Sequence, residues 1–331
     1  MRAPEFWDAP AGALAGVLAP LSAMWTGAAH FRRALARPSR APVPVICVGN
    51  LVAGGAGKTP VVLSLAHWLR LRGVPAHVVT RGYGGTLRGP VRVDPTLHDA
   101  AAVGDEPLLI AAQAPCWVAR DRAAGARAAS DAGAPAILLD DGFQHPGLGK
   151  DISAVVVDAE YRFGNGRIIP AGPLREPIAT GLARADAIVL IGDGDLAIPF
   201  DGPVLRADIA PIAGKRFAGR RVFAFAGIGR PPKFFATLKS CGAEIIGSRT
   251  FADHYRFGHA EIAALHREAQ AANASLVTTA KDWVRLLPAR RAGIDVLEIE
   301  LRWRDEAGLE RLLAPVLGRS DGERDLRAAA G

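Results

Sequence analysis

The stretch VICVGNLVAGGAGKTP, residues 45–60, is the part of the chain that decides its fold. An apolar run comes first, then a glycine-rich loop that ends in Gly57, Lys58 and Thr59, and then a segment that begins with Pro60. A strand, a glycine loop with Gly-Lys-Thr and a helix form the order that a phosphate-binding loop requires. Such a loop surrounds phosphate oxygens with backbone N–H groups, and its lysine and threonine reach the outer phosphates and Mg²⁺. The stretch therefore predicts a site for a nucleotide phosphate.

The loop departs from the strict phosphate-loop pattern at Val52, where that pattern has glycine. Gly54 and Gly55 can supply the backbone freedom instead, because glycine adopts conformations that are closed to other residues. A glycine-rich turn with an exposed lysine is the alternative, but it does not require strand, Gly-Lys-Thr and helix in this order. We expect the nucleotide to be bound by the whole loop: Val52, Ala53, Gly54, Gly55, Ala56, Gly57, Lys58 and Thr59.

Apolar runs and helical patterns alternate along the first two thirds of the chain. Strands are expected at residues 45–49, 76–80, 116–118, 137–141, 152–158 and 187–191, and helices at residues 61–69, 108–112 and 120–132. This alternation predicts right-handed crossovers and a mainly parallel sheet flanked by helices, an α/β fold of the P-loop NTPase type. Ligands of such sheets bind beyond the carboxyl ends of the strands, so the loops after these strands should surround one crevice.

The density of proline and glycine rises around residues 195–220, where a second unit is expected to begin. A shorter alternation follows, with strands expected at residues 221–226, 244–246, 276–279 and 296–301. We therefore expect an N-terminal apolar helix with a basic edge, a P-loop kinase domain, a smaller α/β domain and a flexible tail, at residues 1–40, 41–200, 201–318 and 319–331.

Residues 9–31 contain no Asp, Glu, Lys or Arg, and arginines follow at positions 32, 33, 37 and 40. The large apolar side chains of this run share one helical face: Leu14, Val17, Leu18, Leu21 and Trp25. Prolines and glycines make the run too weakly apolar for a bilayer span, but the apolar face and basic edge suit a helix in the membrane interface. A helix packed on the protein's own core fits equally well. A signal peptide is disfavoured, because Glu5 and Asp8 precede the run with only Arg2 to oppose them.

The composition restricts the possible partners. A formal charge of +7 and a pI near 9.8 favour an anionic partner, although ordinary solubility charge explains them equally well. The arginines are scattered and do not alternate with aromatic residues, so we expect no nucleic-acid partner. Cys47, Cys116 and Cys241 have no paired spacing, which argues against disulfides and a structural zinc site.

Five further residues could take part in chemistry. Asp140 and Asp141 end an apolar strand downstream of the loop, where P-loop enzymes hold Mg²⁺. Asp105 could accept a proton from a hydroxyl group or could cap the helix that follows it, and spacing alone favours the cap. Arg175, in the turn-rich segment 163–177, could neutralise a phosphoryl group, although a surface arginine is the commoner case. His254 becomes a candidate if the two units place it beside a carboxylate.

Seven segments together resemble the tetraacyldisaccharide 4′-kinase family, the lipid A 4′-kinases of Gram-negative envelope synthesis. In chain order they are GNLVAGGAGKTP (49–60), RGYG (81–84), GDEP (104–107), LDDGFQH (139–145), PAGPLRE (170–176), FADH (251–254) and TTAKDW (278–283). The resemblance implies Mg²⁺-dependent transfer of the γ-phosphoryl of ATP to the 4′-hydroxyl of an acylated disaccharide phosphate, a tetraacyl glucosamine disaccharide 1-phosphate. It also implies two α/β domains and peripheral attachment to the cytoplasmic face of the inner membrane.

The resemblance also implies roles for individual residues. Asp105 matches the proposed base of the family and His254 its partner, while Lys58 and Thr59 match the ligands of phosphate and Mg²⁺. The remaining implied residues are a phosphoryl contact and a Mg²⁺-site pair: Arg175, Asp140 and Asp141. Ala280 departs from the family pattern, in which a charged residue is expected, but it lies outside the implied chemistry.

Three other functions compete with this interpretation. The first is a regulatory P-loop GTPase or ATPase; as a GTPase the chain would need a guanine-reading Asn/Thr-Lys-x-Asp segment, and residues 279–282 have the wrong spacing. A nucleic-acid-dependent ATPase would suit the basic pI but leaves the N-terminal apolar helix unexplained. A membrane scaffold that binds nucleotide without turnover does not explain the carboxylates around the loop.

Overall fold

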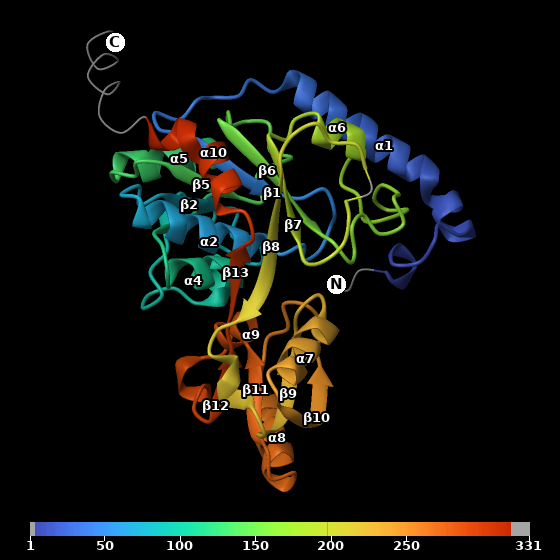
Figure 1. The fold of residues 1–331 in the computed structure, drawn as a ribbon, viewed down its shortest axis with the longest axis vertical. Coiled ribbons are helices and arrows are strands. Elements are labelled where there is room, and N and C mark those ends of the chain that lie inside the picture. The colour runs from blue at the N-terminus through green and yellow to red at the C-terminus, as the bar shows by residue number, and fades with distance from the viewer. Residues whose placement is uncertain (1–3, 197, 319–331) are drawn as a thin grey trace.

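A computed structural model describes residues 4–196 and 198–318. Two sheets form two lobes of unequal size, and the chain passes between the lobes by way of β8 and β13 of the larger sheet (Figure 1). The nine strands of the larger sheet are β1 Val45–Gly49, β2 His77–Thr80, β3 Val91–Arg92, β4 Cys116–Val118, β5 Ile137–Asp140, β6 Ile152–Asp158, β7 Ala187–Ile191, β8 Val204–Pro211 and β13 Ile299–Trp303. The expected α/β architecture of the P-loop NTPase type is confirmed.

The larger sheet has the order β13-β8-β7-β6-β1-β5-β2-β4-β3. Its strands are parallel except that β3 is antiparallel to β4 and β13 is antiparallel to β8. β1 is central, and its Val48 lies beside Asp140 of β5 in the register. The loops that follow β1, β2, β5 and β6 therefore leave the sheet at one edge.

Helices cover both faces of this sheet and bury its apolar strands. One face packs against α2 Lys58–Leu71, α4 Asp105–Ala111 and α10 Glu306–Leu317, through buried residues such as Leu69, Ile110 and Leu313. The other face packs against α5 Arg122–Asp131 and α6 Ile178–Leu182. The short helix α3 Ala100–Val103 leads into α4, and η1 Glu5–Trp7 precedes the first long helix.

The smaller sheet is wholly parallel, with the order β10-β9-β11-β12. Its strands are β9 Arg221–Ala226, β10 Glu244–Thr250, β11 Ser275–Thr279 and β12 Ile294–Leu297. The helices α7 Pro231–Ser240, α8 His259–Ala271 and α9 Ala280–Trp283 accompany it, together with η2 Gly214–Phe217 and η3 Pro288–Arg290. The core of this domain is rich in phenylalanine, with Phe225 on one side of the sheet and Phe217 on the other.

The expected boundary at residue 201 does not match the sheets. β8, β13 and α10 all belong to the larger domain, so the smaller domain is an insertion between β8 and β13. The single strand expected at residues 296–301 is in fact β12 and β13, which lie in different sheets on either side of Glu298. Pro211 of β8 and Ile299 of β13 are paired in the register, so the chain enters and leaves the insertion at one place. The expected tail at residues 319–331 lies outside the described residues.

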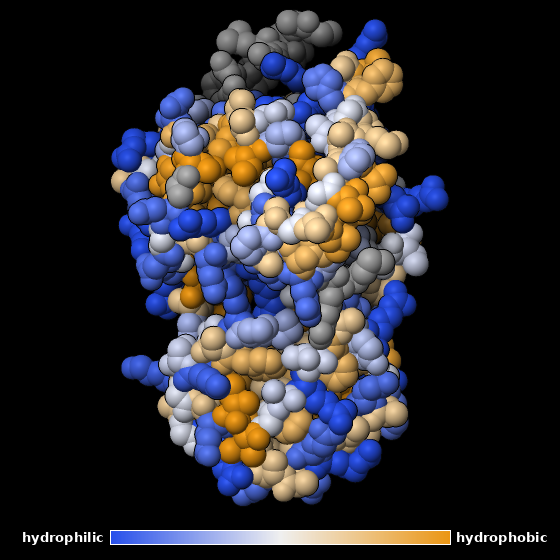
Figure 2. All heavy atoms as spheres, turned by 90° about the vertical axis from the view of Figure 1, so that its right-hand side faces the viewer, coloured by the Kyte–Doolittle hydropathy of each residue, from blue (hydrophilic) through white to orange (hydrophobic). Residues whose placement is uncertain are grey.

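Helix α1, Ala13–Leu35, lies along the outside of the larger domain (Figure 1). It buries only Ala15 and Ser22, so packing on the protein's own core does not explain its large apolar side chains. Those that remain exposed form a stripe at heptad-like spacing: Leu14, Val17, Leu21, Met24, Trp25, Phe31 and Leu35. Figure 2 views this side of the molecule and shows hydrophobic side chains over the larger domain. Within residues 4–196 and 198–318, no helix is long and apolar enough to cross a membrane.

Candidate active site

The phosphate loop joins β1 to α2, which begins at Lys58 and thus earlier than Pro60, where the sequence placed it. Gly57 has φ +84°, and a Cβ there would lie 2.6 Å from Ile191 Cδ1, so only glycine fits this position. Lys58 Nζ donates a hydrogen bond to Asn50 Oδ1 at 3.2 Å and lies 3.6 Å from Asp141 Oδ1. The lysine is therefore held back over its own loop, where the outer phosphates of a nucleotide would lie.

Two loop residues behave differently from the rest of the phosphate loop. Val52 is buried and bridges to Leu174, so its side chain stabilises the loop from the core, which explains why glycine is not required there. The N–H group of Ala53 donates to the carbonyl oxygen of Pro173 at 2.7 Å. That N–H is therefore already bonded within the chain, and the phosphate-facing N–H groups must come from later positions in the loop.

Asp140 is the last residue of β5 and Asp141 follows it, but the two side chains have different surroundings. Asp140 is buried and accepts a hydrogen bond from Thr80 Oγ1 at 3.1 Å on Oδ2, while its Oδ1 has no partner among the described residues. Burial, and then the negative charges of Glu106 and Asp141, raise the pKa of the Asp140 carboxyl above its usual range. A buried carboxylate oxygen without a partner fits a cation such as Mg²⁺.

Asp141 is already paired with cations. Arg175 donates to both of its oxygens, Nη1 to Oδ1 at 2.8 Å and Nη2 to Oδ2 at 3.2 Å. Burial alone would raise the pKa of the Asp141 carboxyl, but the charges of Lys58 and Arg175 outweigh it and lower that pKa. Arg175 is therefore not a solitary surface arginine, because it lies beside the phosphate loop with its guanidinium group against Asp141.

The expectation that Asp105 caps a helix is wrong. Gly104 is the N-cap residue of α4, and Asp105 is the first residue of the helix, 4% exposed. Its carboxylate contacts the smaller domain: His254 Nδ1 lies 3.0 Å from Oδ2, and Arg285 Nε donates to Oδ2 at 2.7 Å. Burial raises the pKa of Asp105, but the hydrogen bond from His254 and the charges of Lys281 and Arg285 lower it well below its usual range.

His254 was a candidate only if the two domains placed it beside a carboxylate, and they do. Its backbone lies in the left-handed region with φ +58°, and its N–H group donates to the carbonyl oxygen of Gly227 at 3.2 Å. The imidazole ring lies between Asp105 and Tyr83 of the larger domain, with its centroid 5.4 Å from the Tyr83 ring. The site is thus built from both domains.

Sequence reasoning assigned no role to three residues that complete this cluster. Lys281 Nζ lies 3.0 Å from Glu106 Oε1 and 4.0 Å from Asp105 Oδ2. Arg285 is as buried as Asp105, and its Nη1 donates to Asp282 Oδ1 at 2.9 Å. The segment TTAKDW could have drawn attention to Lys281 and Asp282, because it follows β11 at the carboxyl edge of the smaller sheet. Nothing in the sequence indicates Arg285.

The loop that carries Arg175 is held from several sides. Gln144 donates to the carbonyl oxygen of Asn50 at 2.9 Å and to Glu176 Oε1 at 3.1 Å. Glu176 is buried and forms ion pairs of 2.9 Å with both Arg33 of α1 and Arg184. The long connection at residues 163–177 is therefore an ordered wall of the site.

Helix α1 touches the same wall through polar contacts. Ser22 Oγ donates to the carbonyl oxygen of Ile168 at 2.7 Å and accepts from the N–H group of Ala171 at 3.3 Å. Trp25 Nε1 donates to the carbonyl oxygen of Arg175 at 3.1 Å. The helix that exposes the apolar stripe therefore also supports the backbone of a site residue.

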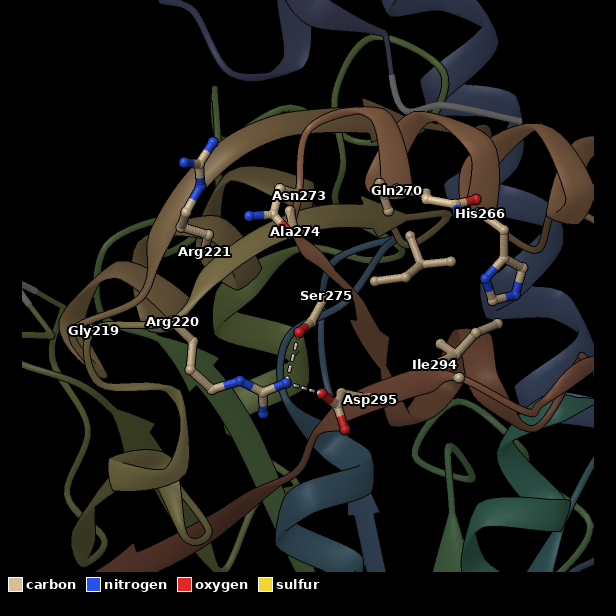
Figure 3. A pocket seen from close by; sticks show the side chains of 13 residues that line it. Gly219, Arg220, Arg221, His266, Gln270, Asn273, Ala274, Ser275, Ile294 and Asp295 are labelled. Carbon is tan, nitrogen blue, oxygen red and sulfur yellow. Dashed lines mark hydrogen bonds and ion pairs between the residues drawn. The ribbon is translucent and has the colours of Figure 1, made fainter.

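A concave surface of the smaller domain is separate from this cluster. Figure 3 shows that Arg220 points at Ser275 and Asp295, and its Nη2 lies 2.7 Å from an oxygen of each. This surface lies at the amino ends of β9, β11 and β12, whereas His254, Lys281 and Arg285 follow carboxyl ends. Since ligands of parallel sheets bind at the carboxyl ends, we assign the site to the opposite edge.

Known proteins resemble the chain over almost its whole length. A family model described as "Tetraacyldisaccharide-1-P 4'-kinase" matches residues 14–318. Proteins named tetraacyldisaccharide 4'-kinase from Rhodospirillum centenum and Dinoroseobacter shibae are 54% and 53% identical, covering 97% and 95% of this chain and 98% and 97% of their own. A crystal structure of the "apo" form of LpxK from Aquifex aeolicus in complex with ATP has a TM-score of 0.75 at 27% identity and covers 92% of this chain and 99% of its own. The chain therefore belongs to the tetraacyldisaccharide-1-P 4'-kinase family.

Proposed function

We propose that the chain transfers the γ-phosphoryl group of ATP to the 4′-hydroxyl of a tetraacyl glucosamine disaccharide 1-phosphate, a step of lipid A biosynthesis. One observation carries the proposal: the phosphate loop follows β1 and the Asp105–His254 pair lies beside the loop that follows β2, so both are at the carboxyl edge of the larger sheet. The loop offers a place for ATP, and the pair offers a proton acceptor for a hydroxyl group. The family to which the chain belongs supplies the substrate class.

The reaction needs few covalent contributions from the protein. The sugar oxygen forms a bond to the γ-phosphorus while the bond from that phosphorus to the leaving oxygen of ADP breaks. Asp105 is ionised at neutral pH because its pKa is low. It takes the proton of the sugar hydroxyl as that hydroxyl becomes more acidic on forming its bond to phosphorus. Lys58 and Arg175 neutralise the negative charge that develops on the transferred group.

The residues present fit a Mg²⁺ ion beside the phosphates. Asp140 Oδ1 is buried without a partner in the described chain, and the Thr59 hydroxyl is in the place that phosphate loops use for the metal. Asp141, already bound by Arg175 and close to Lys58, fits a supporting role better than direct ligation. Among residues 4–196 and 198–318, no group of three or more Asp, Glu, His or Cys side chains is arranged to hold a metal ion by itself. When bound, Mg²⁺ supplies charge neutralisation at the phosphate oxygens.

The substrate carries acyl chains, which explains the exposed apolar stripe of α1. We place that stripe in the interface of the inner membrane's cytoplasmic face, with the protein attached peripherally. Arg32, Arg37 and Arg40 are exposed at the end of the helix and suit anionic lipid head groups. Arg33 differs from them because it faces inward and pairs with Glu176.

The direct test is an assay of transfer of radiolabelled γ-phosphoryl from ATP to a lipid disaccharide monophosphate in detergent. We expect a labelled lipid bisphosphate with Mg²⁺ and none after chelation of the metal. Competition by GTP measures nucleotide preference, and equal use of both nucleotides would favour the regulatory P-loop alternative. A well-folded protein that transfers no label would overturn the proposed function.

A further inference from the structure

We propose that Arg285 is a positioning residue, supplied by the smaller domain, that fixes the orientation of the Asp105 carboxylate for proton transfer. This inference rests on the proposed function, in which Asp105 accepts the hydroxyl proton. Asp105 and Arg285 come from different domains and are 180 positions apart in the sequence. Their contact is buried, with each side chain 4% exposed.

The contact is directional. Two N–H groups of Arg285, on Nε and Nη2, donate to the same oxygen of Asp105, Oδ2, at 2.7 and 2.5 Å. The other oxygen, Oδ1, accepts from the backbone N–H group of Glu106 at 3.0 Å and lies 3.2 Å from His254 Nδ1. The guanidinium group thus fixes Oδ2 in place, and with it the plane in which the carboxylate presents both oxygens to His254 Nδ1, at 3.0 Å from Oδ2 and 3.2 Å from Oδ1.

Arg285 is itself fixed by its own domain. Its Nη1 donates to the carbonyl oxygen of Gly227 at 2.7 Å and to Asp282 Oδ1 at 2.9 Å. Asp282 is fully buried, and it accepts from the N–H group of Gly227 at 2.9 Å and from Thr279 Oγ1 at 2.7 Å. A buried and satisfied network of this kind holds a side chain in one rotamer, so the smaller domain presents a rigid donor pair to Asp105.

Neutralising the charge of Asp105 does not require Arg285. Lys281 lies 4.0 Å from the same carboxylate oxygen and supplies a positive charge, but without a planar pair of donors. A positive charge also lowers the proton affinity of Asp105, which by itself opposes its action as a base. What Arg285 adds is therefore geometry, because its planar fork sets the angle at which the carboxylate meets the crevice.

The test compares Arg285→Lys and Arg285→Met with the parent protein in the lipid phosphorylation assay. A misplaced catalytic group can cost about 100-fold in rate, so we expect kcat to fall about 100-fold in both variants, while the KM for ATP changes less than about threefold. The charge of Arg285 lowers the pKa of Asp105, so Arg285→Met should raise that pKa and move the acidic limb of the kcat–pH profile to higher pH. His254, Lys281 and Glu106 still surround the carboxylate in this variant. Arg290→Lys is the matched control, because the Arg290 side chain donates to the carbonyl oxygen of Phe257 and not to Asp105. Its kcat should stay within about twofold of the parent value.

A second arm is independent of activity. Crystals of Arg285→Met should show the Asp105 carboxylate rotated away from its contact with His254 Nδ1. A kcat within about twofold of the parent, or a variant in which Asp105 keeps its orientation, would overturn the inference. If the parent protein transfers no phosphoryl group, the proposed function fails and the orientation of Asp105 in the crystals alone decides whether Arg285 positions it.

Discussion

Trp25 Nε1 donates a hydrogen bond of 3.1 Å to the carbonyl oxygen of Arg175, which joins the exposed N-terminal helix to the loop bearing a site residue. The Arg175 side chain in turn binds Asp141. The backbone N–H group of Arg175 donates to the carbonyl oxygen of Leu51 at 2.8 Å. One residue therefore touches the helix, the phosphate loop and the acidic pair. Contacts on α1 should accordingly affect turnover as well as attachment.

Trp25→Phe removes this hydrogen bond and keeps an aromatic ring on the helix. The net contribution of such a bond is about 1 kcal/mol, so we expect kcat in detergent to fall by up to about fivefold. Vesicle binding should hardly change, because the apolar surface remains. Met24→Leu, at an exposed neighbouring position, is the control for changes on the helix surface. Unchanged kcat in Trp25→Phe would show that this hydrogen bond does not position Arg175.

Val17→Asp tests the membrane face. Val17 is 75% exposed near the N-terminal end of the apolar stripe, and a carboxylate there would have to be desolvated in the interface. We expect partitioning onto vesicles with anionic phospholipid to weaken about tenfold or more, with little change in kcat in detergent. Leu97→Asp alters another exposed apolar residue away from α1 and should leave partitioning intact. Equal partitioning of the two variants would rule out α1 as the attachment surface.

Asp105→Asn should remove the proton acceptor while keeping the size of the side chain. General base catalysis contributes about 10²–10⁴-fold, so we expect kcat to fall by that order. The affinity for ATP, measured by equilibrium binding, should stay within about threefold because Asp105 does not belong to the phosphate loop. Near-normal turnover of the folded variant would refute the assignment of Asp105 as the base.

Asp140→Asn tests the inferred Mg²⁺ ligand. Loss of one carboxylate ligand should raise the Mg²⁺ concentration needed for tight ATP binding by about tenfold, since a hard cation prefers charged oxygen. Binding of ATP without metal should change much less, and calorimetry separates the two. Asp131→Asn, at an exposed position, is the control. An unaltered Mg²⁺ requirement would place the metal elsewhere.

Glu176→Gln should destabilise the protein in a pH-dependent manner. Burial raises the pKa of Glu176, but hydrogen bonds and charge from Arg184, Gln144 and Arg33 lower it below its usual value. A lowered folded-state pKa stabilises the fold above the ordinary glutamate value of about 4.3, and this stabilisation is lost as the pH falls through the folded-state pKa. We expect a loss of about 2 kcal/mol in the free energy of unfolding at pH 7, because two arginines lose their shared carboxylate.

That difference should shrink as the pH falls below the ordinary glutamate value of about 4.3 and on through the lowered pKa of Glu176, where the parent side chain becomes protonated and resembles glutamine. Urea titrations at several pH values measure the free energy of unfolding for the parent and the variant. Glu310→Gln, at an exposed position, should show no such dependence. A difference that stays undiminished down to the lowest pH at which the parent protein remains folded would mean that the charge of Glu176 is not what stabilises this loop.

Local patterns predicted the parts of the fold that depend on local sequence. The phosphate loop, the parallel strands and the position of Asp140 and Asp141 at a strand end all follow from runs of apolar residues and the turns between them. The division between β12 and β13 could not be predicted, because one apolar alternation continues through Glu298 while the chain passes from one sheet to the other. Which sheet a strand joins is decided by distant partners, here β11 and β8.

Site residues that follow a strand could be predicted from the sequence. Site residues that only tertiary packing places there could not. Lys58 and Asp140 could be placed at the site from spacing alone. His254 needed the docking of a second domain, and Arg285 is an ordinary arginine until that docking sets it against Asp105. The helix-cap alternative for Asp105, which spacing favoured, failed for the same reason, since an aspartate at a helix start caps the helix by default unless distant cations bind it.

The pairing of Pro211 with Ile299 makes the smaller domain a detachable module. Because these residues face each other across an antiparallel ladder, a short hairpin turn could connect them directly, and the remaining chain would keep its nine-stranded sheet. Such a shortened protein would retain the phosphate loop and the acidic pair but lose every side chain that now contacts the carboxylate of Asp105 from across the domain boundary. A single deletion would then separate nucleotide binding from the contacts that hold the Asp105 carboxylate, so the larger domain carries the one contribution to the reaction and the insertion between β8 and β13 carries the other.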